Sequence, residues 1–174
     1  MDTHRDRNLF GLFKDNKDNK LSEDEIQHLM NEIVAIGADP ACFRFNERVG
    51  IGFIDHTGLI YIDRTILNTQ DKIPPKYRLS VRGILAHEYW GHLKNHPSPF
   101  EPNAPEDECW ADDSAARRSL GLSDEERTIL FRRALRHAQV ARAQKGVGHT
   151  GFVYKLDDVI RRYVSHDEIR ELNG

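Results

Sequence analysis

The sequence predicts an α+β fold that is mainly helical and contains a short antiparallel β-sheet. Several stretches carry apolar residues at helical spacing, and three of them begin with a capping box. Between residues 43 and 63 the pattern becomes strand-like. With 174 residues, of which 39% are hydrophobic and 30% charged, the chain suits one globular domain. We expect a flexible leader at 1–20 and a single domain at 21–174.

Composition excludes several classes of protein. The net charge of −3 gives no reason to expect binding to nucleic acid. No apolar run has the length of a membrane span, and no signal peptide begins the chain, so we expect no membrane partner and a cytoplasmic location. Two cysteines are too few for a disulfide scaffold.

The first predicted helix starts at Ser22, which forms a capping box with Glu25, and ends at Gly37. His28 lies off its apolar stripe and is interpreted as a solvated histidine. Two strand-like segments then flank a four-residue turn at 55–58. They are Arg48–Ile54 and Leu59–Asp63, and together they predict a β-hairpin.

A second helix is predicted from Arg78 to Asn95, with an apolar stripe broad enough for the centre of a domain. A third is expected from about Glu106 to Gly121. The residues expected on its buried side are Glu108, Trp110, Ala111, Ala115 and Ala116.

The last predicted helices are a basic one that starts at Ser123 and two short ones near 157–163 and 165–172. The arginines of the basic helix are interpreted as a solvated face; they are Arg127, Arg132, Arg133, Arg136 and Arg142. The glycine-rich loop at 145–151 lacks the phosphate-loop spacing and receives no nucleotide role.

The second helix carries the segment His87-Glu88-Tyr89-Trp90-Gly91-His92. Its histidines are five residues apart, whereas the common zinc-peptidase motif places them four apart on one helical face. In a regular helix, five steps separate two side chains by roughly 140°. Both rings can face one metal only if the helix widens, as in a π-bulge, and Gly91 would tolerate such a backbone. We therefore predict irregular hydrogen bonding between Tyr89 and His92.

Sixteen residues after His92 comes Glu108, which completes the two-His, one-Glu ligand set of a catalytic zinc site. We expect His87, His92 and Glu108 to bind Zn²⁺ and Glu88 to act as general base. Two other pairs at four-residue spacing are weaker candidates. In the pair His92 and His96, the second histidine lies at a helix end. In the pair Glu88 and His92, Glu88 would be a ligand, and no residue would be left as general base.

The layout of a His-Glu helix followed by a helix with a glutamate ligand resembles that of the zincins. Zincin sheets offer an edge strand to an extended peptide substrate. The candidates here are 49–54 and 59–62.

The motif His87–His92 resembles the HExxxH motif of the dipeptidyl peptidase III family, in which an extra residue in the zinc helix is the rule. Asp107-Glu108-Cys109-Trp110-Ala111-Asp112 is similar to that family's second motif, a Glu-Glu-Cys-Arg-Ala-Glu segment whose second Glu binds zinc. The resemblance implies the same three ligands and the same base. The resemblance covers some thirty residues, whereas the members of that family are several times longer than this chain.

Residues 78–127 also look like metallopeptidase domains of bacterial polymorphic toxins. That resemblance implies a toxin or effector domain that acts in a target cell, with an immunity or inhibitor protein as a partner.

The predicted function is therefore hydrolysis of a protein or peptide substrate. Asp112 is expected to orient a ligand imidazole, with a surface aspartate as the alternative. The partner of the oxyanion is open among His149, Tyr154 and His137. Two other functions remain open: a non-catalytic zincin-like binding protein, and zinc-dependent hydrolysis of a non-peptide amide.

Overall fold

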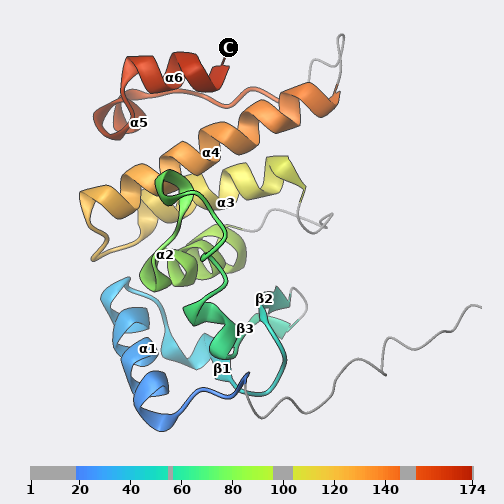
Figure 1. The fold of residues 1–174 in the computed structure, drawn as a ribbon, viewed down its shortest axis with the longest axis vertical. Coiled ribbons are helices and arrows are strands. Elements are labelled where there is room, and N and C mark those ends of the chain that lie inside the picture. Colours follow the sequence, from blue (N-terminus) through green and yellow to red (C-terminus); the bar gives the residue numbers. More distant parts are fainter. Residues whose placement is uncertain (1–18, 55–56, 96–103, 146–151, 174) are drawn as a thin grey trace, which may run out of the picture.

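The computed structural model describes residues 19–54, 57–95, 104–145 and 152–173. Figure 1 shows the elements stacked along the long axis of the molecule, with α1 and the β-sheet at one end and α5 and α6 at the other. Helices α2, α3 and α4 lie between these ends. The predicted α+β class, mainly helical with a small sheet, is confirmed. Most of the predicted leader lies outside the described residues.

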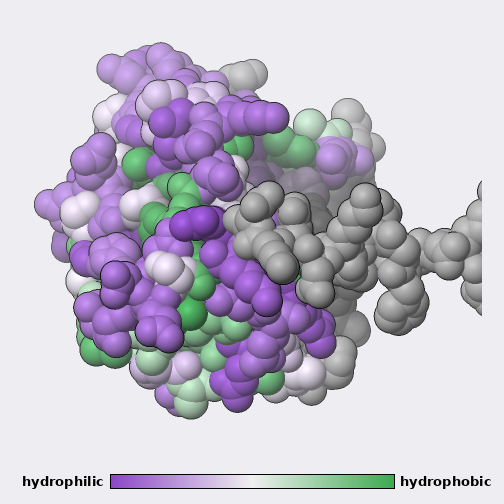
Figure 2. Space-filling view, turned by 60° about the horizontal axis from the view of Figure 1, so that its bottom comes forward, coloured by the Kyte–Doolittle hydropathy of each residue, from purple (hydrophilic) through white to green (hydrophobic). Residues whose placement is uncertain are grey.

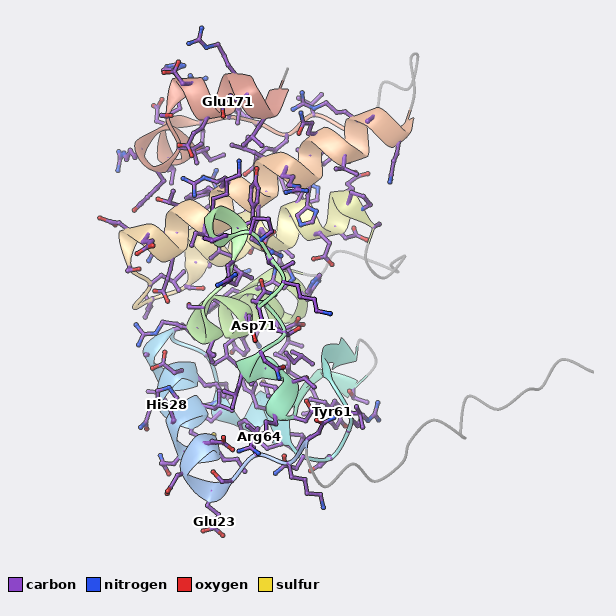
Figure 3. All side chains as sticks on the ribbon, in the orientation of Figure 1. Glu23, His28, Tyr61, Arg64, Asp71 and Glu171 are labelled. Carbon is purple, nitrogen blue, oxygen red and sulfur yellow. The ribbon has the colours of Figure 1, made fainter. Side chains whose placement is uncertain are left out.

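Helix α1 (Glu23–Ala35) begins with the predicted capping box. The Ser22 hydroxyl accepts a hydrogen bond from the backbone N–H of Glu25, whose carboxylate accepts one from the N–H of Ser22. The chain leaves the helix at Gly37, which has a φ of 73°. His28 is exposed on this helix, as predicted, and is labelled in Figure 3.

The sheet is mixed, because a parallel pair of strands that was not predicted lies beside the predicted antiparallel pair. Strands β2 (Ile51–Ile54) and β3 (Leu59–Ile62) form the predicted antiparallel hairpin, although β2 starts three residues later than expected. A short strand, β1 (Phe43–Phe45), pairs in parallel with β3 on its other side. The strand order β1-β3-β2 makes β3 the central strand. It therefore cannot be the edge that receives a substrate.

The predicted second helix has three parts. A 3₁₀ turn, η5 (Pro75–Tyr77), precedes α2 (Val81–Ala86), which begins at the N-cap Ser80. Without a break, α2 continues into a π-helix, η6 (His87–Leu93). The third helix, α3 (Pro105–Arg118), ends three residues before Gly121.

The remaining helices match the predicted order. They are α4 (Asp124–Lys145), α5 (Asp158–Tyr163) and α6 (His166–Asn173). Helix α4 packs along α3 for most of its length, and α5 and α6 contact α4 on its far side (Figure 1). The capping boxes of α4 and α6 form as predicted.

Two burial predictions, one for α3 and one for α4, are wrong. Trp110 is 40% exposed instead of buried, and its ring packs edge-on against Phe152. The arginines of α4 are not simply a solvated face. Arg127, Arg132 and Arg133 are partly buried and donate hydrogen bonds to groups outside α4.

Most of the face in Figure 2 is hydrophilic, with hydrophobic residues in a band near its centre and in smaller groups toward its lower and upper right edges. Among the helices within the described ranges, none is long and apolar enough to cross a membrane.

Candidate metal centre

The π-helix brings residues five apart onto one face, because its hydrogen bonds run from each N–H to the carbonyl five residues earlier. The bond from the N–H of Lys94 to the carbonyl of Tyr89, 2.9 Å long, has this spacing. The predicted irregularity of the helix is therefore confirmed. It extends over seven residues, His87–Leu93, and not over a single inserted one.

Gly91 is required by a close approach and not by its own backbone conformation. It is not among the glycines with positive φ. A Cβ at this position would lie 2.6 Å from the carbonyl oxygen of Ala111 in α3. One turn along α3, the Ser114 hydroxyl donates a 2.8 Å hydrogen bond to the carbonyl of Trp90. The missing side chain thus lets α3 lie directly against η6.

This contact brings the three predicted ligands together. The Nε2 atoms of His87 and His92 lie 3.0 Å apart. The Glu108 carboxylate lies beside both, with Oε2 at 3.2 Å from His87 Nε2 and Oε1 at 3.5 Å from His92 Nε2. Ligand atoms of a tetrahedral zinc site are separated by about 3.3 Å. These three residues, the His–His–Glu cluster, therefore have the donor types and spacing to hold zinc.

Asp112 lies behind the first of these ligands. Its carboxylate is fully buried, and Oδ1 lies 2.8 Å from Nδ1 of His87. Of the two interpretations of Asp112, the structure favours the orienting residue over the surface aspartate. A carboxylate on Nδ1 holds the proton there and leaves Nε2, on the opposite side of the ring, as the free donor atom.

The cluster favours a bound cation. Burial by itself lowers the pKa of His87, but the carboxylates of Asp112, Glu108 and Glu88 outweigh burial and raise it to about 10. Burial by itself raises the pKa of Glu108. Its contacts with His87 and His92 outweigh burial and lower the pKa to well below its usual value. The carboxylates around the two imidazoles therefore favour positive charge at the cluster.

Glu88, the predicted base, is half-buried in η6 and lies close enough to His87 for its charge to act on that ring. It is not part of the His–His–Glu cluster. Its carboxylate is thus near the cluster without being one of its three donors.

The predicted oxyanion partners have different surroundings. His137, in α4, lies near the cluster, with Nε2 at 3.5 Å from Oδ2 of Asp112. Tyr154 is buried elsewhere: its hydroxyl donates a hydrogen bond to Asp113, and burial together with that carboxylate raises its pKa. The hydroxyl of Tyr154 therefore contacts Asp113, and its role as oxyanion partner stays a prediction. His149, and the alternative ligand His96, lie outside the described residues.

Arg133 lies at this centre, although the sequence predicts it to be part of the solvated face of the basic helix. Arg133 contacts the Asp112 carboxylate, with Nε at 3.2 Å from Oδ2. Its four-residue spacing from His137 along α4 puts both on one helical face and was the available signal. The acidic partner on α3 could not be identified from that spacing alone.

The sheet lies next to the centre, because both β2 and β3 contact η6. Of the two predicted substrate strands, β2 is at the edge of the sheet, in the order β1-β3-β2. It remains the candidate for pairing with an extended peptide.

Comparison of the chain with known protein-family models, curated protein sequences and solved structures finds no match in any of the three.

Proposed function

We propose that the chain is a zinc-dependent peptidase. His87, His92 and Glu108 would hold the metal, and Glu88 would be the general base. The observation that supports this most strongly is the convergence of two imidazole Nε2 atoms and one carboxylate at separations of 3.0–3.5 Å. It depends on a π-helix at the point where the spacing of the histidines demands one.

Each residue of the centre would have its own role in hydrolysis. Bound zinc would supply a Lewis acid and a water molecule of lowered pKa. Glu88 would accept the proton of the attacking water and deliver it to the leaving nitrogen. Asp112 would hold the Nδ1–H of His87 and so direct Nε2 toward the metal. Of the two histidines considered as oxyanion partner, His137 is the one within the described residues, and it would take this role from its position beside Asp112.

An extended peptide is the substrate class that fits best. Strand β2 is an edge strand and contacts the π-helix, so a peptide paired with it would pass beside the cluster. The resemblance to polymorphic-toxin domains adds the proposal that the peptidase is a delivered effector, inhibited by a partner protein.

Metal content is the first test. The purified full chain should contain one equivalent of zinc, and a chelator should remove it. A chain that purifies without zinc and does not bind added zinc contradicts the proposal.

The second test compares cleavage of a proteome-derived peptide library by the wild type and by Glu88→Gln. We expect new peptide termini only with the wild type, while Glu88→Gln keeps its zinc. Glu125→Gln is the matched control, since Glu125 is exposed at the start of α4. Cleavage by Glu88→Gln at the wild-type rate would exclude Glu88 as the base.

The same test separates the alternatives. Full zinc content without any hydrolysis would favour a binding protein that uses zinc structurally. Chelator-sensitive hydrolysis of non-peptide amides alone would favour the other class of hydrolase.

A further inference from the structure

Helix α4 contributes none of the three ligands, yet one of its arginines reaches the metal centre. The guanidinium Nε of Arg133 lies 3.3 Å from Oδ1 and 3.2 Å from Oδ2 of Asp112. It therefore spans both oxygens of the carboxylate that holds His87. The Arg133 side chain is 16% exposed, so this contact is largely shielded from water.

Asp112 depends on contacts of this kind to keep its orientation. A buried carboxylate must satisfy both oxygens, and a charge without a partner is costly there. Oδ1 faces His87, and Oδ2 faces His137 at 3.5 Å. Arg133 bridges the two oxygens, which fixes the rotation of the carboxylate about its Cβ–Cγ bond.

We propose that Arg133 is a positioning residue of the metal centre. It holds the Asp112 carboxylate so that Oδ1 stays on Nδ1 of His87 and the Nε2 of that ring faces the other two ligands. This inference rests on the proposed zinc site and adds to it a link from α4 through α3 to η6.

The adjacent arginine is a matched control. Arg132 also joins a carboxylate on another helix, Glu168 in α6, with 2.8 Å from its Nε to Oε1. Both arginines also donate to backbone carbonyls of η5, Arg132 to Lys76 and Arg133 to Tyr77. They therefore make similar cross-links, but only Arg133 acts on a residue that contacts a ligand.

The test measures the zinc dissociation constant by competition with a chelator. Loss of an outer partner of a ligand typically weakens metal binding 10–100-fold, and Arg133 holds such a partner, so we expect Arg133→Met to weaken it by about tenfold. Arg133→Lys, which keeps the charge, should recover part of the loss. Arg132→Met should stay within about twofold of the wild type. Equal affinities for Arg133→Met and the wild type, or an equal loss with Arg132→Met, would overturn the inference.

A double mutant separates positioning from general stability. In an Asp112→Asn background, Arg133→Met should cause no further loss of zinc affinity, because its effect passes through that carboxylate. The visible absorption of Co²⁺ bound in place of zinc should change with Arg133→Met and not with Arg132→Met. If Arg133→Met causes a further loss of zinc affinity in the Asp112→Asn background, only the positioning role of Arg133 is overturned, and the proposed function is not. A wild type that binds no zinc overturns the proposed function as well.

Discussion

Asp112 and Asp113 are adjacent aspartates on α3, both buried, with 0% and 8% of their surface exposed. Asp112 contacts His87 and Arg133, and so belongs to the metal centre. Asp113 accepts hydrogen bonds from Arg117, one turn later in the same helix, and from Tyr154 in the C-terminal segment. One step of about 100° along a helix is enough to separate these two networks.

The comparison teaches that α3 has two polar faces with different roles. The face with Asp112 arranges donor atoms around a small space. The face with Asp113 attaches the C-terminal segment, since Arg117 also forms an ion pair with Asp157 at 2.7 Å. Changes on the first face should alter metal binding, whereas changes on the second should alter stability.

The largest effect is expected from His92→Ala, which removes a donor on the first face. Zinc binding should weaken by more than about 100-fold, because the loss of an outer partner alone can cost that much. The dissociation constant from chelator competition measures it. His28→Ala, at an exposed site on α1, is the control. Full zinc occupancy in His92→Ala would show that this ligand assignment is wrong.

The pair Asp112→Asn and Asp113→Asn tests the comparison itself. Asp112→Asn should weaken zinc binding by about 10–100-fold. Asp113→Asn should leave zinc binding unchanged and lower the free energy of unfolding by about 1–3 kcal/mol, because Arg117 and Tyr154 lose a charged acceptor. Chelator competition and urea unfolding of the metal-free chain measure the two quantities. Equal losses of zinc affinity would remove the distinction between the faces.

The next effect, on stability and on zinc binding, is expected from Gly91→Ala, which pushes α3 away from η6. Its Cβ would lie 2.6 Å from a backbone oxygen, and overpacking of this kind costs about 1–3 kcal/mol of stability. Zinc binding should also weaken, because Glu108 moves with α3. Gly52→Ala is the control, since no atom lies within 4 Å of a Cβ there. Unfolding of Gly91→Ala at the wild-type urea concentration would contradict the close approach.

The smallest effect concerns pH on the second face. Hydrogen bonding to Arg117 lowers the pKa of Asp157 to about 2, below the value of roughly 3.9 expected in the unfolded chain. The carboxylate therefore stabilises the fold fully above about pH 4, and this contribution is lost as the pH falls toward 2.

Since the Asp157 side chain is 39% exposed and the ion pair is screened by solvent, we expect the contribution to be below about 1 kcal/mol. Unfolding of the metal-free wild type and of Asp157→Asn should therefore differ at pH 6 and converge near pH 2. A difference that is constant over this range would rule out the ion pair as its source.

Features that depend on neighbouring residues could be predicted from the sequence. The capping boxes at Ser22, Ser123 and Ser165 form because each needs only a backbone and a side chain three residues apart. The widened helix followed from the count of residues between His87 and His92, because a regular helix cannot place both rings on one side.

Features that depend on distant packing could not be predicted. Strand β1 has three residues and forms only because β3 offers it a partner. Arg133 looks like the other arginines of α4 until α3 places Asp112 beneath it. Tyr154 and His137 were equal candidates in the sequence, and only tertiary structure separates a hydroxyl bound to Asp113 from a ring near the cluster.

The π-helix also determines how this centre can change through insertion and deletion. Removing one residue between His87 and His92 would leave a four-residue spacing, which a regular α-helix already satisfies. Return of η6 to an α-helix therefore requires a deletion as well. Without it the five-residue spacing would turn the two rings roughly 140° apart, whereas a single deletion together with the regular helix would keep them on one side.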